Sequence, residues 1–351
     1  MRERRIASFT ILSVLVCTSA CGSGPARSSG EVVTTRLVVH DTVISTASEL
    51  IGGVSDMVVG PDGRLYIVDY QSHSILSVRP DGTDPRTFGR EGAGPGEFRT
   101  PLAIAISSDS IWVYDMENAR VQTLDLTGAY RGQYRWPLPY FGRAPSLNDR
   151  GALVVATGGE DSALVVVVRG GESEPIPVGE PVAPPVEVFN LTSIRERIRK
   201  GEIPEEFRND VLPVWGDDES IFVLFLSQPE IRRYDLGGDL LWTRTIDEPV
   251  LESVREAFFR KNRESTNPLE LFALSYFQDG QVVDGDLWVL LNSEGEEDGI
   301  VLVLDGEDGS MRRRLVLDGL GSVSRFAIDP SRGRMYVSVP DEAMVVAFSV
   351  E

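Results

Sequence analysis

The chain has 351 residues, of which 42% are hydrophobic and 25% are charged, a composition typical of a globular protein rather than a disordered one. Its formal net charge of −20 makes a nucleic-acid backbone or an anionic membrane surface an unfavourable main partner. A chain of this length can form one large domain or two medium ones.

Residues 1–20 have the features of a signal peptide and are left out of the fold. A basic start is followed by the apolar run Ile6–Val16, which is shorter than the ~20 residues that span a bilayer as a helix. The next residues, Thr-Ser-Ala followed by Cys21, resemble a bacterial lipoprotein lipobox. The resemblance implies lipid attachment at Cys21 and an exported protein anchored to the cell envelope, at the outer membrane or its periplasmic face. Ordinary signal-peptidase cleavage near Ala20 is the alternative.

Residues 21–30 are small and polar and predict a flexible tether before a folded domain at 31–351. Glu31–Ile44 then alternates apolar and polar residues and predicts one lone strand. Residues 54–81 predict three short strands, VSDMVV, RLYIVD and SILSVR, separated by Asp-Gly turns and a corner.

Residues 88–128 repeat this pattern after the glycine-rich lead-in FGREGAGPGEF. The corner between their second and third strands contains Asp115, Asn118 and Arg120 in a D-x-x-N-x-R arrangement. This stretch resembles an NHL repeat, which implies a β-propeller blade. The corner predicts a structural role rather than a binding site, because Asp and Asn side chains commonly hold such turns by local hydrogen bonds.

The pattern recurs from residues 144, 212, 274 and 323, so six units follow at a spacing of ~45 residues. Such a period indicates a propeller or an array. The last unit ends at Glu351 with only three strands, whereas Glu31–Ile44 is a strand without a partner. Pairing the two would close a ring without an exposed edge. The predicted fold is therefore all-β, a six-bladed propeller closed by an N-terminal strand.

Two helical inserts interrupt the repeats, at about 190–211 and 247–277. In the first, Leu191, Ile194 and Ile198 have helical spacing, and Gly201 ends the run. The second predicts two helices. One has Leu251, Val254 and Phe258 on one stripe, and the other begins at Asn267–Pro268 with its apolar side chains, Leu269, Phe272, Ala273 and Tyr276, turned inward.

Because strands alternate in direction, both inserts are predicted on the face that carries the corners between second and third strands. Basic inserts over acidic corners suggest that the inserts cover part of the channel and form a binding face, although scattered solvated charges are an equally good explanation. The candidate residues of this face are Glu160, Asp161, Arg195, Arg199, Arg255, Arg260, Glu294, Glu296, Glu297 and Asp298.

The channel is the other candidate site, at the starts of the inner strands. Among the inner-strand starts, only Asp56 is an anionic ligand, and one carboxylate is too few for a calcium site built from several carboxylates. The sequence therefore assigns no metal ligands, and calcium stays open as a possible cofactor. Trp215 and Tyr276 could act there as stacking platforms for a sugar or another small ligand.

Three functions follow from these patterns. The first is a non-enzymatic envelope protein, expected to be monomeric, that binds an unidentified protein or peptide through the insert-bearing face. The second is a divalent-metal-dependent hydrolase or lyase acting in the channel, because six-bladed propellers similar to this one include calcium-dependent lactonases. The third is a binder of glycans or small ligands.

Overall fold

The computed structural model describes residues 32–135, 145–171, 174–186, 189–217, 219–267, 269–293 and 295–350. The predicted signal peptide, the tether and Cys21 lie outside the described residues. The described part forms 25 strands in six sheets, with two α-helices. Neither helix of this part is long and apolar enough to cross a bilayer.

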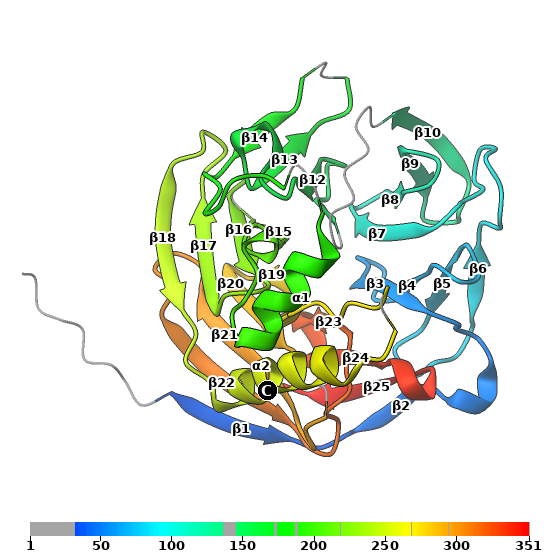
Figure 1. The fold of residues 1–351 in the computed structure, drawn as a ribbon. Helices are drawn as coiled ribbons and strands as arrows, with labels where there is room; N and C mark the ends of the chain where they lie inside the picture. The colour runs from blue at the N-terminus through cyan, green and yellow to red at the C-terminus, as the bar shows by residue number, and fades with distance from the viewer. Residues whose placement is uncertain are drawn as a thin grey trace, which may run out of the picture. The chain divides into compact units, whose positions relative to one another are not determined.

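Each of the six sheets is one blade of a β-propeller, and Figure 1 shows the blades arranged around a common axis. The inner strand of each blade contacts the inner strands of its neighbours, and β23 of blade six contacts β3 of blade one, so the ring is closed. The predicted six-bladed propeller is confirmed. Its core consists of the apolar layers between adjacent blades, in which most residues of the second strands are buried, as are all five of IFVLF in blade four.

The strands of the first three blades, from the axis outward, are as follows. Blade one has β3 (Val54–Val59), β4 (Leu65–Asp69), β5 (Ser74–Val78) and β6 (Arg86–Phe88). Blade two has β7 (Pro101–Ile106), β8 (Ser110–Asp115), β9 (Arg120–Asp125) and β10 (Tyr130–Arg135). Blade three has β11 (Ser146–Leu147), β12 (Leu153–Ala156), β13 (Val165–Val168) and β14 (Ile176–Val178).

The other three blades contain both ends of the described chain. Blade four has β15 (Val211–Trp215), β16 (Ile221–Phe225), β17 (Glu230–Tyr234) and β18 (Leu240–Thr245). Blade five has β19 (Phe277–Val283), β20 (Asp286–Leu291), β21 (Gly299–Asp305), β22 (Met311–Leu317) and, outermost, β1 (Val33–Leu37). Blade six has β23 (Arg325–Asp329), β24 (Arg334–Val339), β25 (Met344–Ser349) and β2 (Asp41–Ile44).

The N-terminal segment forms two strands, where the sequence predicts one. β2 pairs antiparallel with β25 and supplies the fourth strand of blade six, which confirms the predicted closure. β1 instead pairs parallel with β22, from Val33 beside Arg313 to Leu37 beside Leu317. The prediction of a single strand is wrong because this parallel pairing joins residues almost the whole chain apart, which local alternation does not reveal.

The first insert contains α1 (Leu191–Lys200), as predicted. Asn190 caps it, since its side chain accepts a hydrogen bond from Ser193 N at 3.1 Å. Gly201 ends it with φ 83°, a left-handed conformation that favours glycine. Ile194 and Ile198 are fully buried.

The second insert contains one helix, α2 (Pro249–Glu264), rather than two. The predicted helix over residues 267–276 is wrong. Asn267 instead forms a turn in which its side chain accepts from Leu269 N, and both backbone polar groups of Phe272 bond to the Asn262 side chain. These partners replace helical hydrogen bonds, and Leu269, predicted to face inward, is 79% exposed.

The inserts lie on the predicted face, as seen in Figure 1, where α1 and α2 lie side by side. Their contact is mainly apolar, because Ile198, Val254 and Phe258 belong to one buried cluster with the strands of blades four and five, and Arg263 Nη2 donates to the Ile198 carbonyl at 3.5 Å. The connections that the structure describes contain five 3-10 helices, η1 (Thr46–Ser48), η2 (Glu160–Ser162), η3 (Glu205–Phe207), η4 (Pro330–Arg332) and η5 (Pro340–Glu342).

Candidate functional site

A cavity of about 350 Å³ runs along the propeller channel. At one end its lining residues, including Ser55, Asp279 and Arg325, belong to the starts of inner strands. At the other end Asp149 and Glu219 lie in exposed turns that follow the inner strands of blades three and four. The cavity therefore opens to solvent on the face opposite to the one that carries the inserts.

Three charged residues occupy equivalent positions in consecutive blades at the inner end of this cavity. Asp279 of blade five, Arg325 of blade six and Asp56 of blade one each pair with the penultimate residue of the second strand of their blade. In blades five and one a β-bulge precedes the aspartate. A bulge re-aims the neighbouring side chains, and here both aspartates line the channel.

Each carboxylate is held by one backbone N–H group of its own blade and one of the next blade. Asp56 accepts hydrogen bonds from Met57 N and Ile104 N, both at 2.8 Å. Asp279 accepts from Gly280 N at 2.9 Å and from Phe326 N at 3.0 Å. Burial raises the pKa of Asp56 to about 7, aided by the nearby Asp279. Burial likewise raises the pKa of Asp279 to about 6, against the opposing charge of Arg325. Both carboxyls can therefore exchange a proton near neutral pH.

Arg325 joins blade six to both neighbouring blades. Its Nε donates to the carbonyl of Ser55 at 2.6 Å, and its Nη1 donates to the carbonyls of Gln278 and Ser324 at 2.8 and 2.7 Å. Within the described residues, Nη2 of this guanidinium donates to no protein acceptor. Gln281 adds a second link, because its Nε2 donates to the carbonyls of Met57 and Phe326.

Of the three channel residues predicted from the sequence, Asp56 and Trp215 line the cavity and Tyr276 does not. Trp215 is only 7% exposed, and its indole N–H donates to the carbonyl of Ser146 at 3.1 Å. This packing leaves little of the ring for stacking. Tyr276 is buried in the apolar cluster under the insert helices.

Sequence reasoning missed Asp279 and did not select Arg325 as a site residue. It began blade five at Leu274 and took Tyr276 as a channel residue, whereas β19 begins at Phe277. Residues 277–280, FQDG, align with residues 54–57, VSDM, of blade one, and both segments have the bulge directly before the aspartate. That alignment could have identified Asp279 as the counterpart of Asp56.

The predicted binding-face residues lie around the inserts, but their polar contacts are mostly local. Nη2 of Arg195 donates to the carbonyls of Asn267 and Glu270, so it joins the two inserts. Arg255 bonds to Glu252 within α2, and Asp298 pairs with Arg36 of β1 at 2.9 Å. The exposed members are Glu160, Arg199, Arg260, Glu296 and Glu297. Glu294 lies outside the described residues, and the side chain of Asp161 is not described.

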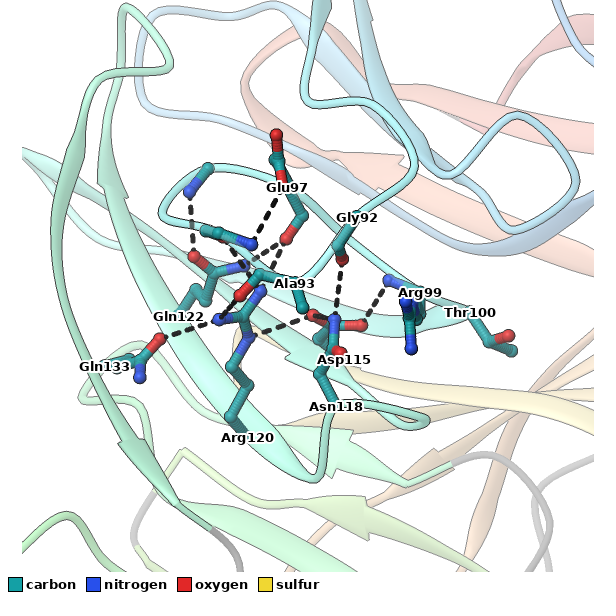
Figure 2. A network of polar contacts seen from close by, with 12 residues as sticks. Gly92, Ala93, Glu97, Arg99, Thr100, Asp115, Asn118, Arg120, Gln122 and Gln133 are labelled. Atoms are coloured by element: carbon teal, nitrogen blue, oxygen red, sulfur yellow. Dashed lines mark hydrogen bonds and ion pairs between the residues drawn. The ribbon is translucent and has the colours of Figure 1, made fainter.

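The corner of blade two holds the glycine-rich loop that precedes its inner strand (Figure 2). The Asp115 carboxylate is fully buried and accepts from Arg99 N at 2.6 Å, Asn118 Nδ2 at 2.7 Å and Arg120 Nε at 3.0 Å. Arg120 also donates to the loop carbonyls of Ala93, Gly94 and Glu97. These contacts use nearly every N–H donor of the Arg120 guanidinium, so little of it is available to a ligand. The corner therefore has a structural role, which is to hold the glycine-rich loop.

No protein-family model and no curated protein matches the chain, so the resemblance to an NHL repeat stays a prediction. Among solved structures, the PQQ-bound aldose sugar dehydrogenase from Streptomyces coelicolor is 12% identical, covers 89% of this chain and 97% of its own, and has a TM-score of 0.51. Regucalcin from Agrobacterium tumefaciens, described as a calcium-binding protein, is 11% identical, with coverages of 90% and 96% and a TM-score of 0.50. At these identities the similarity is one of fold alone.

Proposed function

We propose that the protein binds a small, uncharged polar ligand in its propeller channel, without catalysis. The observation that carries this proposal is the inner end of the cavity, which is lined by Arg325, Asp56 and Asp279, with Nη2 of Arg325 bonded to no acceptor among the described residues. The guanidinium can donate to a carbonyl or hydroxyl oxygen, and the carboxyls can accept from hydroxyl groups.

The charges of the lining favour an uncharged ligand over an anion. Two arginines, Arg150 and Arg325, face five acidic residues, and Glu219 already pairs with Arg150. The five acidic residues are Asp56, Asp149, Asp217, Glu219 and Asp279. A compound with hydroxyl and carbonyl groups, such as a sugar or a lactone, matches this set.

Calcium, which the lactonase resemblance implies, does not fit the described channel. Each carboxylate oxygen of Asp56 and Asp279 already accepts a backbone N–H, and a guanidinium lies among the nearby carbonyl oxygens. No group of three Asp, Glu, His or Cys side chains among the described residues could hold a metal ion. Calcium prefers six to eight oxygen ligands.

The test is calorimetric titration of the exported domain with an aldose, an aldonolactone, an amino acid and a dicarboxylate. We expect saturable binding of a neutral probe that Arg325→Gln and Asp279→Asn each weaken at least about tenfold, whereas Glu297→Gln, on the insert-bearing face, leaves it unchanged. Binding that survives both channel variants would refute the proposal. Release of acid from the lactone would identify a hydrolase instead.

A second candidate function is capture of a protein partner by the insert-bearing face. It is favoured by two large apolar side chains that flank the inserts, Phe189 at 55% and Leu269 at 79% exposed. A defined crosslink that Phe189→Ser and Leu269→Ser abolish, and that Leu240→Ser on the outer strand β18 preserves, would support this function. Equal loss with all three variants would argue against it.

We also propose export and lipid attachment at Cys21, on the strength of the lipobox-like residues alone. Metabolic labelling with an alkyne fatty acid should mark the wild-type chain and not Cys21→Ser. A labelled Cys21→Ser chain would exclude this site.

A further inference from the structure

The lining of the channel cavity changes from charged to aliphatic toward its solvent opening. Val58 and Val282 lie two and three residues beyond Asp56 and Asp279 on the same strands, about 7 and 10 Å nearer the opening. Ile106 of the neighbouring strand β7 packs against the same apolar cluster as Val58 and also lines the cavity. These three side chains are only partly buried although they lie inside the ring. Val58, Ile106 and Val282 thus form an aliphatic band above the charged inner end.

Two uncharged polar side chains of the lining are already bonded within the protein. Nε2 of Gln281 donates to the carbonyls of Met57 and Phe326 at 3.1 and 2.6 Å. The Ser146 hydroxyl accepts from Trp215 N at 3.4 Å. Trp215 is the one aromatic residue among the described residues of the lining, and its ring is packed away. A ligand hydroxyl beside the aliphatic band would therefore give up hydrogen bonds to water and contact carbon instead. This disfavours a ligand with hydroxyl groups along its whole length.

We propose that the channel ligand is a short aliphatic compound with one amide-like polar end, which lies against Asp56, Asp279 and Arg325. The carbonyl oxygen of an amide can accept from the Arg325 guanidinium, and its N–H groups can donate to a carboxylate. Each oxygen of the two carboxylates takes one backbone N–H, which leaves about two of the roughly four lone-pair positions of each carboxylate. The alkyl body then lies along the aliphatic band. This inference rests on the proposed channel site and narrows its ligand.

The test is calorimetric titration with the straight-chain amides from propanamide to hexanamide. At pH 8, above the raised pKa values of about 7 and 6, the Asp56 and Asp279 carboxyls are ionised, so one charge state of the site is compared. We expect affinity to rise about fourfold with each added methylene, because each is transferred from water to the aliphatic band. Hexanoate should bind at least about tenfold more weakly than hexanamide, because its negative charge faces two carboxylates.

Two kinds of variant separate the polar end from the alkyl body. Arg325→Gln should weaken every amide by a similar factor, whereas Val58→Thr, which replaces a methyl group with a hydroxyl, should reduce the gain per methylene. Val282→Thr, on the other side of the cavity, should repeat the second result. Val59→Thr is the matched control, because Val59 is the next residue of β3 and lies outside the cavity lining, so the amide series should be unchanged.

Three results would overturn the inference: amide affinities that do not depend on chain length, hexanoate binding as tight as hexanamide binding, or equal effects of Val58→Thr and Val59→Thr. In those cases an aldose whose binding Arg325→Gln weakens would leave the proposed channel site in place. Absence of binding by every neutral probe, the aldose included, would refute the proposed site together with the inference.

Discussion

Buried aspartates have two different roles in this propeller, one in the channel and the other in the corner of blade two. Asp56 and Asp279 face a cavity and have raised pKa values because burial disfavours their charged forms. Asp115 is completely buried, yet it has a charged partner and three hydrogen-bond donors. The first pair can respond to pH or to a ligand, whereas the second site is committed to holding a loop.

The Asp56 carboxyl should make the protein less stable as the pH rises. Its pKa is higher in the folded protein than in the unfolded chain, so the stabilisation is complete below about pH 4 and is lost as the pH rises through about 7. We expect wild type to lose at least ~1 kcal/mol more of its free energy of unfolding than Asp56→Asn between pH 5 and pH 8. Urea unfolding at both pH values measures this difference, and parallel curves would contradict it.

Arg120 should be far more important for stability than a neighbouring arginine of the same loop. Arg120→Ala leaves the fully buried Asp115 carboxylate without its charged partner, a change that typically costs ~3–5 kcal/mol of unfolding free energy. Arg90 pairs with Glu97 in the same loop, but its side chain is 79% exposed, so Arg90→Ala should cost less than ~1 kcal/mol. Urea unfolding of the two variants compares them directly, and similar losses would show that burial of the pair does not decide its strength.

At the level of elements, the sequence predicts the strands and turns that local residues determine. It does not predict pairings and hydrogen bonds that depend on residues elsewhere in the chain. The blades are predictable because alternating strands and Asp-Gly turns are local signals. The β1 pairing depends on a partner far away in the sequence, β22, and the departure from a helix at Phe272 depends on side-chain hydrogen bonds from Asn262, which periodicity does not reveal. Asp279 was missed because a single bulge shifts the register of β19, and one residue of shift exchanges channel-facing and blade-facing side chains.

The two N-terminal strands should contribute unequally to stability. A chain that begins at residue 39 loses β1, most of which is exposed at the outer edge of blade five. A chain that begins at residue 46 also loses β2, whose Val43 and Ile44 are buried in the core between blades six and one. We expect a small fall in the thermal midpoint for the first truncation and a large fall, or no folded protein, for the second. Equal effects would mean that β2 does not close the ring.

At the level of the whole molecule, the two faces of the ring have different roles. One face carries the insert helices, packed by apolar contacts, and the other carries the solvent opening of the channel. The channel and insert proposals thus concern opposite faces, so variants on one face should leave the other function intact. The net charge of −20 makes a polyanion an unfavourable partner for the chain as a whole.

The parallel direction of β1 has a consequence for where a membrane tether would join the ring. Val33 lies beside Arg313, toward the start of β22, so the chain enters the ring on the face where the channel opens. Cys21 precedes Val33 by 12 residues, a span of at most about 40 Å. Under the proposed lipid attachment, the membrane tether and the channel opening would share one face of the ring, and the face with the insert helices would be the one without a tether.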